Sequence, residues 1–152
     1  MNKDGCVVII EDDMDDQLLI EEVFTELNYS NEIIFFGDGE AALKFLTSGN
    51  KNPFLILSDI NLRKLSGFEL RMKLKQNADI HLKCIPYLFF TTASNHQAVI
   101  DAYSISVQGF FTKPNSYPEL QGQIKIIMEY WTHCSAPNDF KPEFSNRETI
   151  KN

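Results

Sequence analysis

The stretch FLILSDIN, residues 54–61, places one carboxylate directly behind a short apolar run. Residues 54–57 are apolar at every position, which is typical of a strand that is covered on both faces. A charge at the end of a buried strand is costly unless other groups compensate it. We therefore expect Asp59 to lie at the end of a core strand, with partners supplied by other parts of the chain.

Similar apolar runs occur before and after this stretch. They lie at residues 6–10, 33–36, 87–90 and 109–111. Apolar residues at helical spacing predict helices over residues 14–27, 40–46, 67–76, 97–104 and 118–132. Alternating strands and helices predict parallel strands joined by right-handed crossovers. We expect an α/β fold, a doubly wound (βα)5 three-layer sandwich with a five-stranded parallel sheet, for which 2-1-3-4-5 is a common strand order.

Length and composition limit the classes of protein that the chain can represent. Its 152 residues suit one domain, and no apolar run approaches the roughly 20 residues of a membrane span. A net charge of −7 disfavours binding to nucleic acid or anionic lipid. The N-terminus lacks signal-peptide features, and the widely spaced Cys6, Cys84 and Cys134 indicate reduced thiols. We expect a cytoplasmic protein with protein partners and with no nucleic-acid or membrane contacts.

Acidic residues follow two predicted strands that are neighbours if the strand order is 2-1-3-4-5. Glu11 and Asp12 follow the first strand and Asp59 follows the third, at the sheet edge where open parallel sheets bind ligands. Carboxylates placed so close together repel one another, and a divalent cation with oxygen ligands relieves the repulsion. The sequence therefore predicts an Mg²⁺ or Mn²⁺ site. Asp15 and Asp16 are interpreted instead as first-turn residues that stabilise the helix dipole.

Hydroxyl and cationic groups end the fourth and fifth predicted strands. Thr91 and Thr92 lie at the end of the fourth strand, and Lys113 follows the fifth. Taken singly, these are more typical of ordinary strand threonines and a surface lysine. Together with a metal ion they suit the three anionic oxygens of a phosphoryl group. We predict that Asp59 acts as a nucleophile and forms an acyl phosphate.

Four motifs resemble those of a known family, the receiver domain of bacterial two-component response regulators, of the CheY-like superfamily. They are VVIIEDD (7–13), LILSDINLRKLSGFEL (55–70), PYLFFTTAS (86–94) and GFFTKP (109–114), and the resemblance covers roughly residues 5–132. It implies a flavodoxin-like fold with the strand order 2-1-3-4-5. It also implies a signalling domain that is not an enzyme beyond its own phosphorylation and dephosphorylation.

The resemblance implies a role for each of these strand-end residues. Asp59 would accept a phosphoryl group from the phosphohistidine of a sensor histidine kinase or hybrid kinase. Glu11 and Asp12 match the acidic pair of the family, and Asn61 matches the position whose backbone carbonyl completes the metal shell. Lys113 matches the lysine that pairs with the phosphoryl oxygens.

Two further positions correspond to the switch that responds to phosphorylation in this family. The switch hydroxyl is Thr91 or Thr92; the interval to Lys113 favours Thr91, whereas the pairing with the following alanine favours Thr92. Phe110 falls at the switch aromatic, although the tyrosine hydroxyl common there is missing. The Lys113-Pro114 bond is often cis in such domains.

The end of the chain bears on the output of the domain. Residues 1–133 are predicted to form the receiver domain, and residues 134–152 a polar C-terminal tail too short for an output domain. We expect a stand-alone receiver that transfers its phosphoryl group onward, or changes the surface around the fourth helix and fifth strand for a downstream protein target. Arg63 replaces a proline frequent in the family, so the acceptor loop is expected to be less rigid. A homodimer is compatible with the sequence, which does not decide the oligomeric state.

Two other functions fit part of the pattern. A metal-dependent phosphohydrolase would also use Asp59 as nucleophile, but it would commonly carry a second acid where Asn61 stands. A receiver-like interaction module would never become phosphorylated. The complete set of acids, threonine and lysine disfavours this second alternative.

Overall fold

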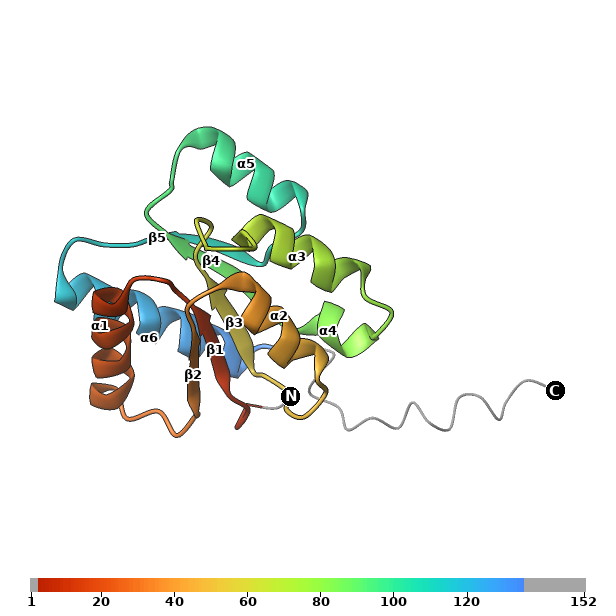
Figure 1. Cartoon of the computed structure of the whole chain (residues 1–152). Coiled ribbons are helices and arrows are strands. Elements are labelled where there is room, and N and C mark those ends of the chain that lie inside the picture. Colours follow the sequence, from red (N-terminus) through yellow and green to blue (C-terminus); the bar gives the residue numbers. More distant parts are fainter. Residues whose placement is uncertain (1–2, 136–152) are drawn as a thin grey trace.

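One parallel sheet brings the predicted site residues to the same edge of the molecule. The computed structural model describes residues 3–135. Its strands pair in parallel in the order β2-β1-β3-β4-β5 (Figure 1). They are β1 (Val7–Ile10), β2 (Ile33–Phe36), β3 (Leu55–Ser58), β4 (Tyr87–Thr91) and β5 (Gly109–Thr112). The predicted doubly wound fold and its strand order are confirmed.

Each helix begins behind a polar side chain that accepts a backbone N–H of the first turn. The helices are α1 (Met14–Glu26), α2 (Gly39–Thr47), α3 (Gly67–Gln76), α4 (Ile80–Cys84), α5 (His96–Ser104) and α6 (Tyr117–His133). Their N-caps are Asp13, Asp38, Ser66, Asp79, Asn95 and Ser116. Aspartate, asparagine and serine suit this position because their oxygens satisfy N–H groups that lack a partner within the helix.

The sequence predicted all these helices except α4, with bounds within one residue of those observed. Helix α4 has five residues, too few to show helical periodicity. The fourth predicted helix, residues 97–104, is therefore α5 of the structure, and the fifth is α6. Within residues 3–135, every helix is too short or too polar to span a lipid bilayer.

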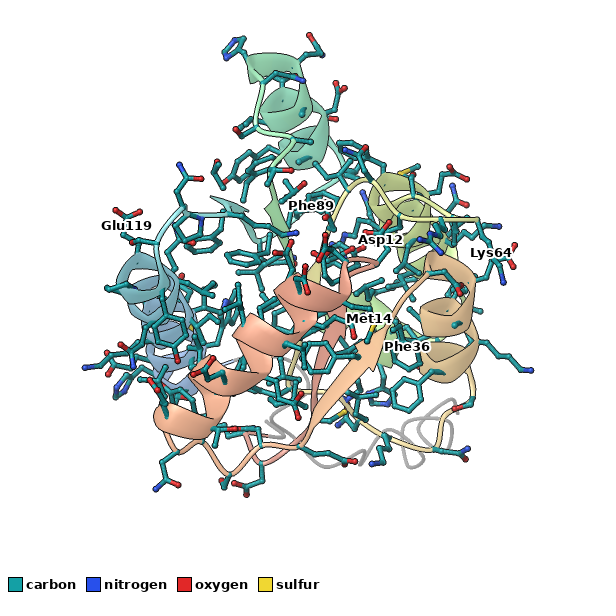
Figure 2. All side chains as sticks on the ribbon, turned by 60° about the vertical axis from the view of Figure 1, so that its left-hand side comes forward. Asp12, Met14, Phe36, Lys64, Phe89 and Glu119 are labelled. Atoms are coloured by element: carbon teal, nitrogen blue, oxygen red, sulfur yellow. The ribbon has the colours of Figure 1, made fainter. Side chains whose placement is uncertain are left out.

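Two cores lie on opposite faces of the sheet. Val7 and Ile9 pack with buried residues of α1 and α6, whereas Val8 and Ile10 pack with buried residues of α2, α3, α4 and α5. Figure 2 shows side chains between the sheet and the helices, and the Phe36 ring packs 5.1 Å from the Phe45 ring of α2. Helices on both faces account for strands that are apolar at successive positions.

Helix α6 is the last element of the described residues. Its last residue is His133, and Cys134 is the C-cap. The predicted tail lies outside the described residues apart from positions 134 and 135, and the division of the chain at residue 133 stays a prediction. No cis peptide bond occurs in residues 3–135, so the Lys113-Pro114 bond is trans, in contrast to the form common in the resembled family.

Candidate functional site

The pairing of β1 with β3 places three carboxylates together at the carboxyl-terminal edge of the sheet. Ile10 lies opposite Ser58 in the register, and the Asp59 N–H donates to the Ile10 carbonyl at 2.9 Å. Oxygens of Glu11, Asp12 and Asp59 lie within 4.8 Å of one another. Glu11 is 2% and Asp59 8% exposed. The predicted acidic cluster therefore forms, and most of it is buried.

The two oxygens of the Asp59 carboxylate have different surroundings. Oδ1 accepts the Thr91 hydroxyl at 2.5 Å, the Ile60 N–H at 2.6 Å and the Asn61 N–H at 3.4 Å. Among the described residues, Oδ2 accepts one hydrogen bond, from Lys113 Nζ at 3.1 Å. Oδ1 is therefore held by several donors, and Oδ2 keeps lone pairs that other groups can use.

Lys113 reaches three carboxylates from the end of β5. Its Nζ contacts Glu11 Oε2 at short range, Asp16 Oδ2 at 2.9 Å and Asp59 Oδ2 at 3.1 Å. Burial by itself would lower the pKa of Lys113, but the hydrogen bonds to Glu11 and Asp16 and the charge of Asp59 raise it above its ordinary value. Lys113 is therefore a cation within an acidic site, as predicted from its position.

Burial acts strongly on the Glu11 carboxylate. Burial raises the pKa of Glu11 to about 7, although Lys113 and the Asp13 N–H, which donates at 3.0 Å, both act to lower it. The charged form of Glu11 is therefore poorly stabilised despite its lysine partner. A cation with oxygen ligands would compensate this loss of hydration.

The structure distinguishes the two candidate threonines. Thr91 is fully buried; its hydroxyl donates to Asp59 and accepts the Ala93 N–H at 3.2 Å. Thr92 is exposed and lies just beyond the last residue of β4. The geometry supports Thr91 as the switch hydroxyl, and the switching role itself stays a prediction.

The other predicted positions lie around this centre. Phe110 is partly buried, with its ring 6.1 Å from that of Phe89 in an edge-to-face arrangement. Asn61 follows Asp59 in the acceptor loop, and the proposed use of its carbonyl oxygen stays a prediction. Arg63 forms an isolated parallel bridge with Asp38, and its carbonyl accepts N–H groups from Gly39 and Leu65. Backbone hydrogen bonds thus hold the loop at the position where the family often has proline.

Asp16 is the member of this site that the sequence reasoning missed. It lies in the first turn of α1, as predicted, but its carboxylate also contacts Lys113. The sequence feature that could have placed Asp16 near the site is the short distance along the chain between the β1 acids and α1, since the first turn of that helix must lie beside the sheet edge. The pairing with Lys113 depends on β5, nearly a hundred residues later.

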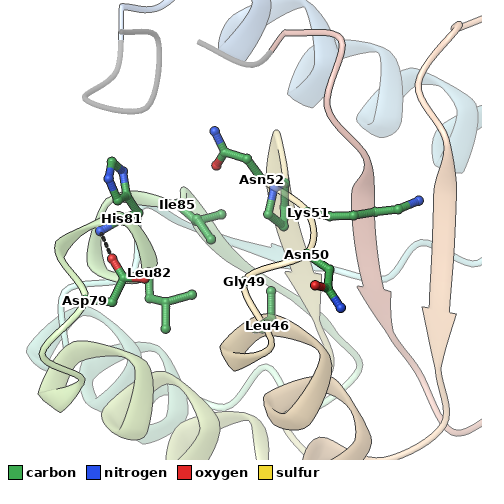
Figure 3. A pocket seen from close by; sticks show the side chains of 10 residues that line it. Leu46, Gly49, Asn50, Lys51, Asn52, Asp79, His81, Leu82 and Ile85 are labelled. Atoms are coloured by element: carbon green, nitrogen blue, oxygen red, sulfur yellow. Dashed lines mark hydrogen bonds between the residues drawn. The ribbon is translucent and has the colours of Figure 1, made fainter. Parts of the chain in front are cut away.

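A separate pocket lies at the opposite edge of the sheet, and the charged side chains beside it do not converge on one point. It has a volume of about 350 Å³ and lies between the α2–β3 loop and α4 (Figure 3). Lys51 extends away from it and pairs with Glu32, while the Asp79 carboxylate caps α4 by accepting the His81 N–H at 2.9 Å. We therefore place the functional site at the edge that carries Asp59.

A family model and curated relatives match most of this chain. Residues 7–125 match the family model of the response regulator receiver domain. Rcp1 of Synechocystis sp., a response regulator, is 33% identical over 135 residues, which cover 86% of this chain and 90% of Rcp1. FilR2 of Methanothrix harundinacea, a probable methanogenesis regulatory protein, is 30% identical over 82% of each chain.

Solved structures show the same architecture. The Mn²⁺-bound form of response regulator Rcp1 has a TM-score of 0.78 at 32% identity, covering 88% of this chain and 99% of that one. The phosphorylated cyanobacterial phytochrome response regulator RcpA has a TM-score of 0.79 at 28% identity, covering 88% and 98%. The chain therefore belongs to the family of response regulator receiver domains, the signalling domains of two-component phosphorelays.

Proposed function

We propose that Asp59 accepts a phosphoryl group from the phosphohistidine of a sensor histidine kinase or hybrid kinase. The observation that carries this proposal is the asymmetry of the Asp59 carboxylate. Oδ1 is held by Thr91 and by two backbone N–H groups, whereas Oδ2 faces Lys113. A nucleophile needs one fixed oxygen for orientation and one oxygen with available lone pairs.

The transfer is a displacement at phosphorus. A bond forms between Asp59 Oδ2 and phosphorus as the bond between phosphorus and the donor's imidazole nitrogen breaks, and its electron pair stays on that nitrogen. Lys113 Nζ, 3.1 Å from Oδ2, and the Thr91 hydroxyl are the donors for the phosphoryl oxygens. Attack of water on phosphorus later releases inorganic phosphate and restores the carboxylate.

We propose that the acidic cluster holds Mg²⁺ or Mn²⁺ during this reaction. The ligands would be carboxylate oxygens of Glu11, Asp12 and Asp59, together with the backbone carbonyl of Asn61. Support comes from the three carboxylates within 4.8 Å of one another and from hard oxygen ligands, which suit these ions. When bound, the ion neutralises negative charge on the phosphoryl group and its acceptor. The solved structure of Rcp1 named above is an Mn²⁺-bound form.

The proposed output is a changed protein-binding surface formed by α5, β5 and α6. Phe110 lines a groove of about 270 Å³ there, together with Tyr103, Tyr130 and Trp131. Because Phe110 packs against Phe89, two residues before Thr91 on β4, movement of Thr91 toward a phosphoryl group would change the packing of Phe110. Phosphorylation would thus bias two states of this surface for a downstream protein target, or precede onward transfer of the phosphoryl group.

Intact-mass measurement tests the acceptor directly. Incubation with acetyl phosphate and Mg²⁺ is expected to add one phosphoryl mass to the protein and none to Asp59→Asn. Removal of Mg²⁺ by a chelator is expected to suppress the addition. Absence of added mass in the wild-type protein, or its persistence in Asp59→Asn, would refute the proposal. Steady release of phosphate from phosphomonoesters would indicate a phosphohydrolase instead.

A further inference from the structure

The ammonium of Lys113 has all its hydrogen-bond donors engaged by carboxylates. A lysine ammonium has three N–H donors, and Lys113 Nζ contacts oxygens of Glu11, Asp16 and Asp59. The Lys113 side chain is 10% exposed. A phosphoryl group on Asp59 would take over the donor that now faces Oδ2. Any further hydrogen bond from Lys113 to the phosphoryl oxygens requires that its hydrogen bond to another carboxylate breaks.

Asp16 differs from the other two partners of Lys113. Glu11 and Asp59 are buried at strand ends, with side chains 3% and 10% exposed, whereas the Asp16 side chain is 37% exposed. Capping of α1 is done by Asp13, whose Oδ1 accepts the Asp16 N–H at 3.1 Å. The Asp16 carboxylate therefore has no capping role, and Lys113 has two further carboxylate partners, Glu11 and Asp59.

We propose that Asp16 is a positioning residue that limits phosphoryl capture by Asp59. It holds one N–H of Lys113 on the α1 side of the site and adds a negative charge where the anionic donor must approach. The inference rests on the proposed function of Asp59. It names a fourth carboxylate that regulates this reaction from outside the acidic cluster.

The sign of the effect follows from the charges. Glu11, Asp12, Asp16 and Asp59 carry four formal negative charges, against one positive charge on Lys113 and two on the divalent ion proposed above, so the site keeps a net negative charge. Asp16→Asn removes one negative charge while it keeps an oxygen that can accept from Lys113. The less negative site attracts an anionic phosphoryl donor more strongly. At low ionic strength we expect an increase in rate of about five-fold, the factor for unit charges about 4 Å apart in a water-like dielectric.

Asp15 provides a matched control for this substitution. It lies beside Asp16 in the first turn of α1 and is exposed, and its N–H also donates to Asp13, at 2.8 Å. Asp15→Asn therefore removes the same charge from the same turn. Within the described residues no ion pair joins Asp15 to Lys113.

The experiment compares second-order rate constants for phosphorylation of the full chain by acetyl phosphate and Mg²⁺, followed by intact mass. We expect Asp16→Asn to react about five-fold faster than the wild-type protein at low salt and Asp15→Asn less than about two-fold faster. In roughly 1 M salt, where the screening length is about 3 Å, the difference should largely disappear. Circular dichroism verifies that both variants are folded.

The possible results separate this inference from the proposed function. Equal rates for the two variants, or a slower reaction of Asp16→Asn, would overturn the role of Asp16 even if the wild-type protein is phosphorylated on Asp59. A five-fold effect that persists in high salt would also overturn it, because the cause would not be charge. A wild-type protein that takes up no phosphoryl group contradicts the proposed function itself.

Discussion

Gly67 is the position where the acceptor loop leaves least room for a side chain. A Cβ there would lie 2.2 Å from the Asp59 carbonyl oxygen, 2.8 Å from Phe89 Cε1 and 3.0 Å from Ile60 Cα. The backbone on both sides is held, since the Ser58 hydroxyl donates to the Asp59 carbonyl at 2.8 Å and the Gly67 N–H donates to the Ile60 carbonyl at 2.9 Å. We predict that Gly67→Ala displaces the loop that carries Asp59.

The size of this effect follows from the overlap. Ordinary contact begins at 3.4 Å, so the Asp59 carbonyl must move by about 1.2 Å, the difference between 3.4 and 2.2. Overpacking of this kind costs about 1–3 kcal/mol, and more where backbone must move. Gly67 has no positive φ, and alanine gains at most about 1 kcal/mol in a helix. Taking the upper end of the cost, about 3 kcal/mol, less the helical gain of about 1, we expect a net loss of about 2 kcal/mol in the free energy of unfolding. An acceptor displaced by about 1 Å should react roughly a hundred-fold more slowly.

Urea denaturation and the rate of phosphorylation by acetyl phosphate measure the two consequences. Gly122 in α6 is the matched control, because a Cβ there meets no atom within 4 Å. Gly122→Ala should stabilise the protein by up to about 1 kcal/mol and leave the phosphorylation rate unchanged. If Gly67→Ala were as stable as Gly122→Ala and reacted at the wild-type rate, the close approach described above would be wrong.

Three other predictions concern buried polar groups. Thr91→Ala loses the hydrogen bonds to Asp59 and from Ala93, so chemical denaturation should show a free energy of unfolding lower by about 2 kcal/mol. The exposed control Thr92→Ala should change it by less than about 0.5 kcal/mol. Arg71, 3% exposed, donates to two carbonyls of the α5–β5 connection at 2.7 and 3.4 Å. Arg71→Ala should therefore lower the free energy of unfolding by about 2–4 kcal/mol. A similar loss in the more exposed Lys75→Ala would contradict a specific role of Arg71 in holding this connection. The pKa of Glu11 in the folded protein is about 7, above its ordinary 4.5. Glu11 therefore favours the folded state at low pH, where it is protonated, and this stabilisation is lost as pH rises through 7. In chelator, the wild-type protein should therefore lose up to about 3 kcal/mol relative to Glu11→Gln between pH 4.5 and 8, and parallel curves for the two proteins would contradict this.

Much of the fold was predictable because it depends on local periodicity. The uninterrupted apolar runs and the amphipathic segments between them predicted five strands and five of the helices, as observed. Helix α4 was not predicted because five residues contain little more than one helical turn. Its start is nonetheless encoded locally, since Asp79 accepts the His81 N–H at 2.9 Å.

The site was predictable to the extent that sheet topology governs it. Once β1 and β3 were expected as neighbours, Glu11, Asp12 and Asp59 had to meet at one edge, and they do. The choice between Thr91 and Thr92 depended on which face of β4 turns toward Asp59. A shift of one residue in strand register exchanges the two faces. The interval between Thr91 and Lys113 along the chain therefore favoured Thr91, but it did not show the contact of Thr91 with Asp59.

The sequence by itself thus determined the strands and most of the helices. With the strand order that the family resemblance implies, it also determined the edge of the sheet that carries the chemistry and the residue types that meet there. Only the tertiary structure decided the contacts between side chains: the short bond from Thr91 to Asp59 Oδ1, and the three carboxylates around Lys113. The physical reason is that periodicity is a local property of the chain, whereas an ion pair between Asp16 and Lys113 depends on how α1 and β5 pack around the same sheet edge.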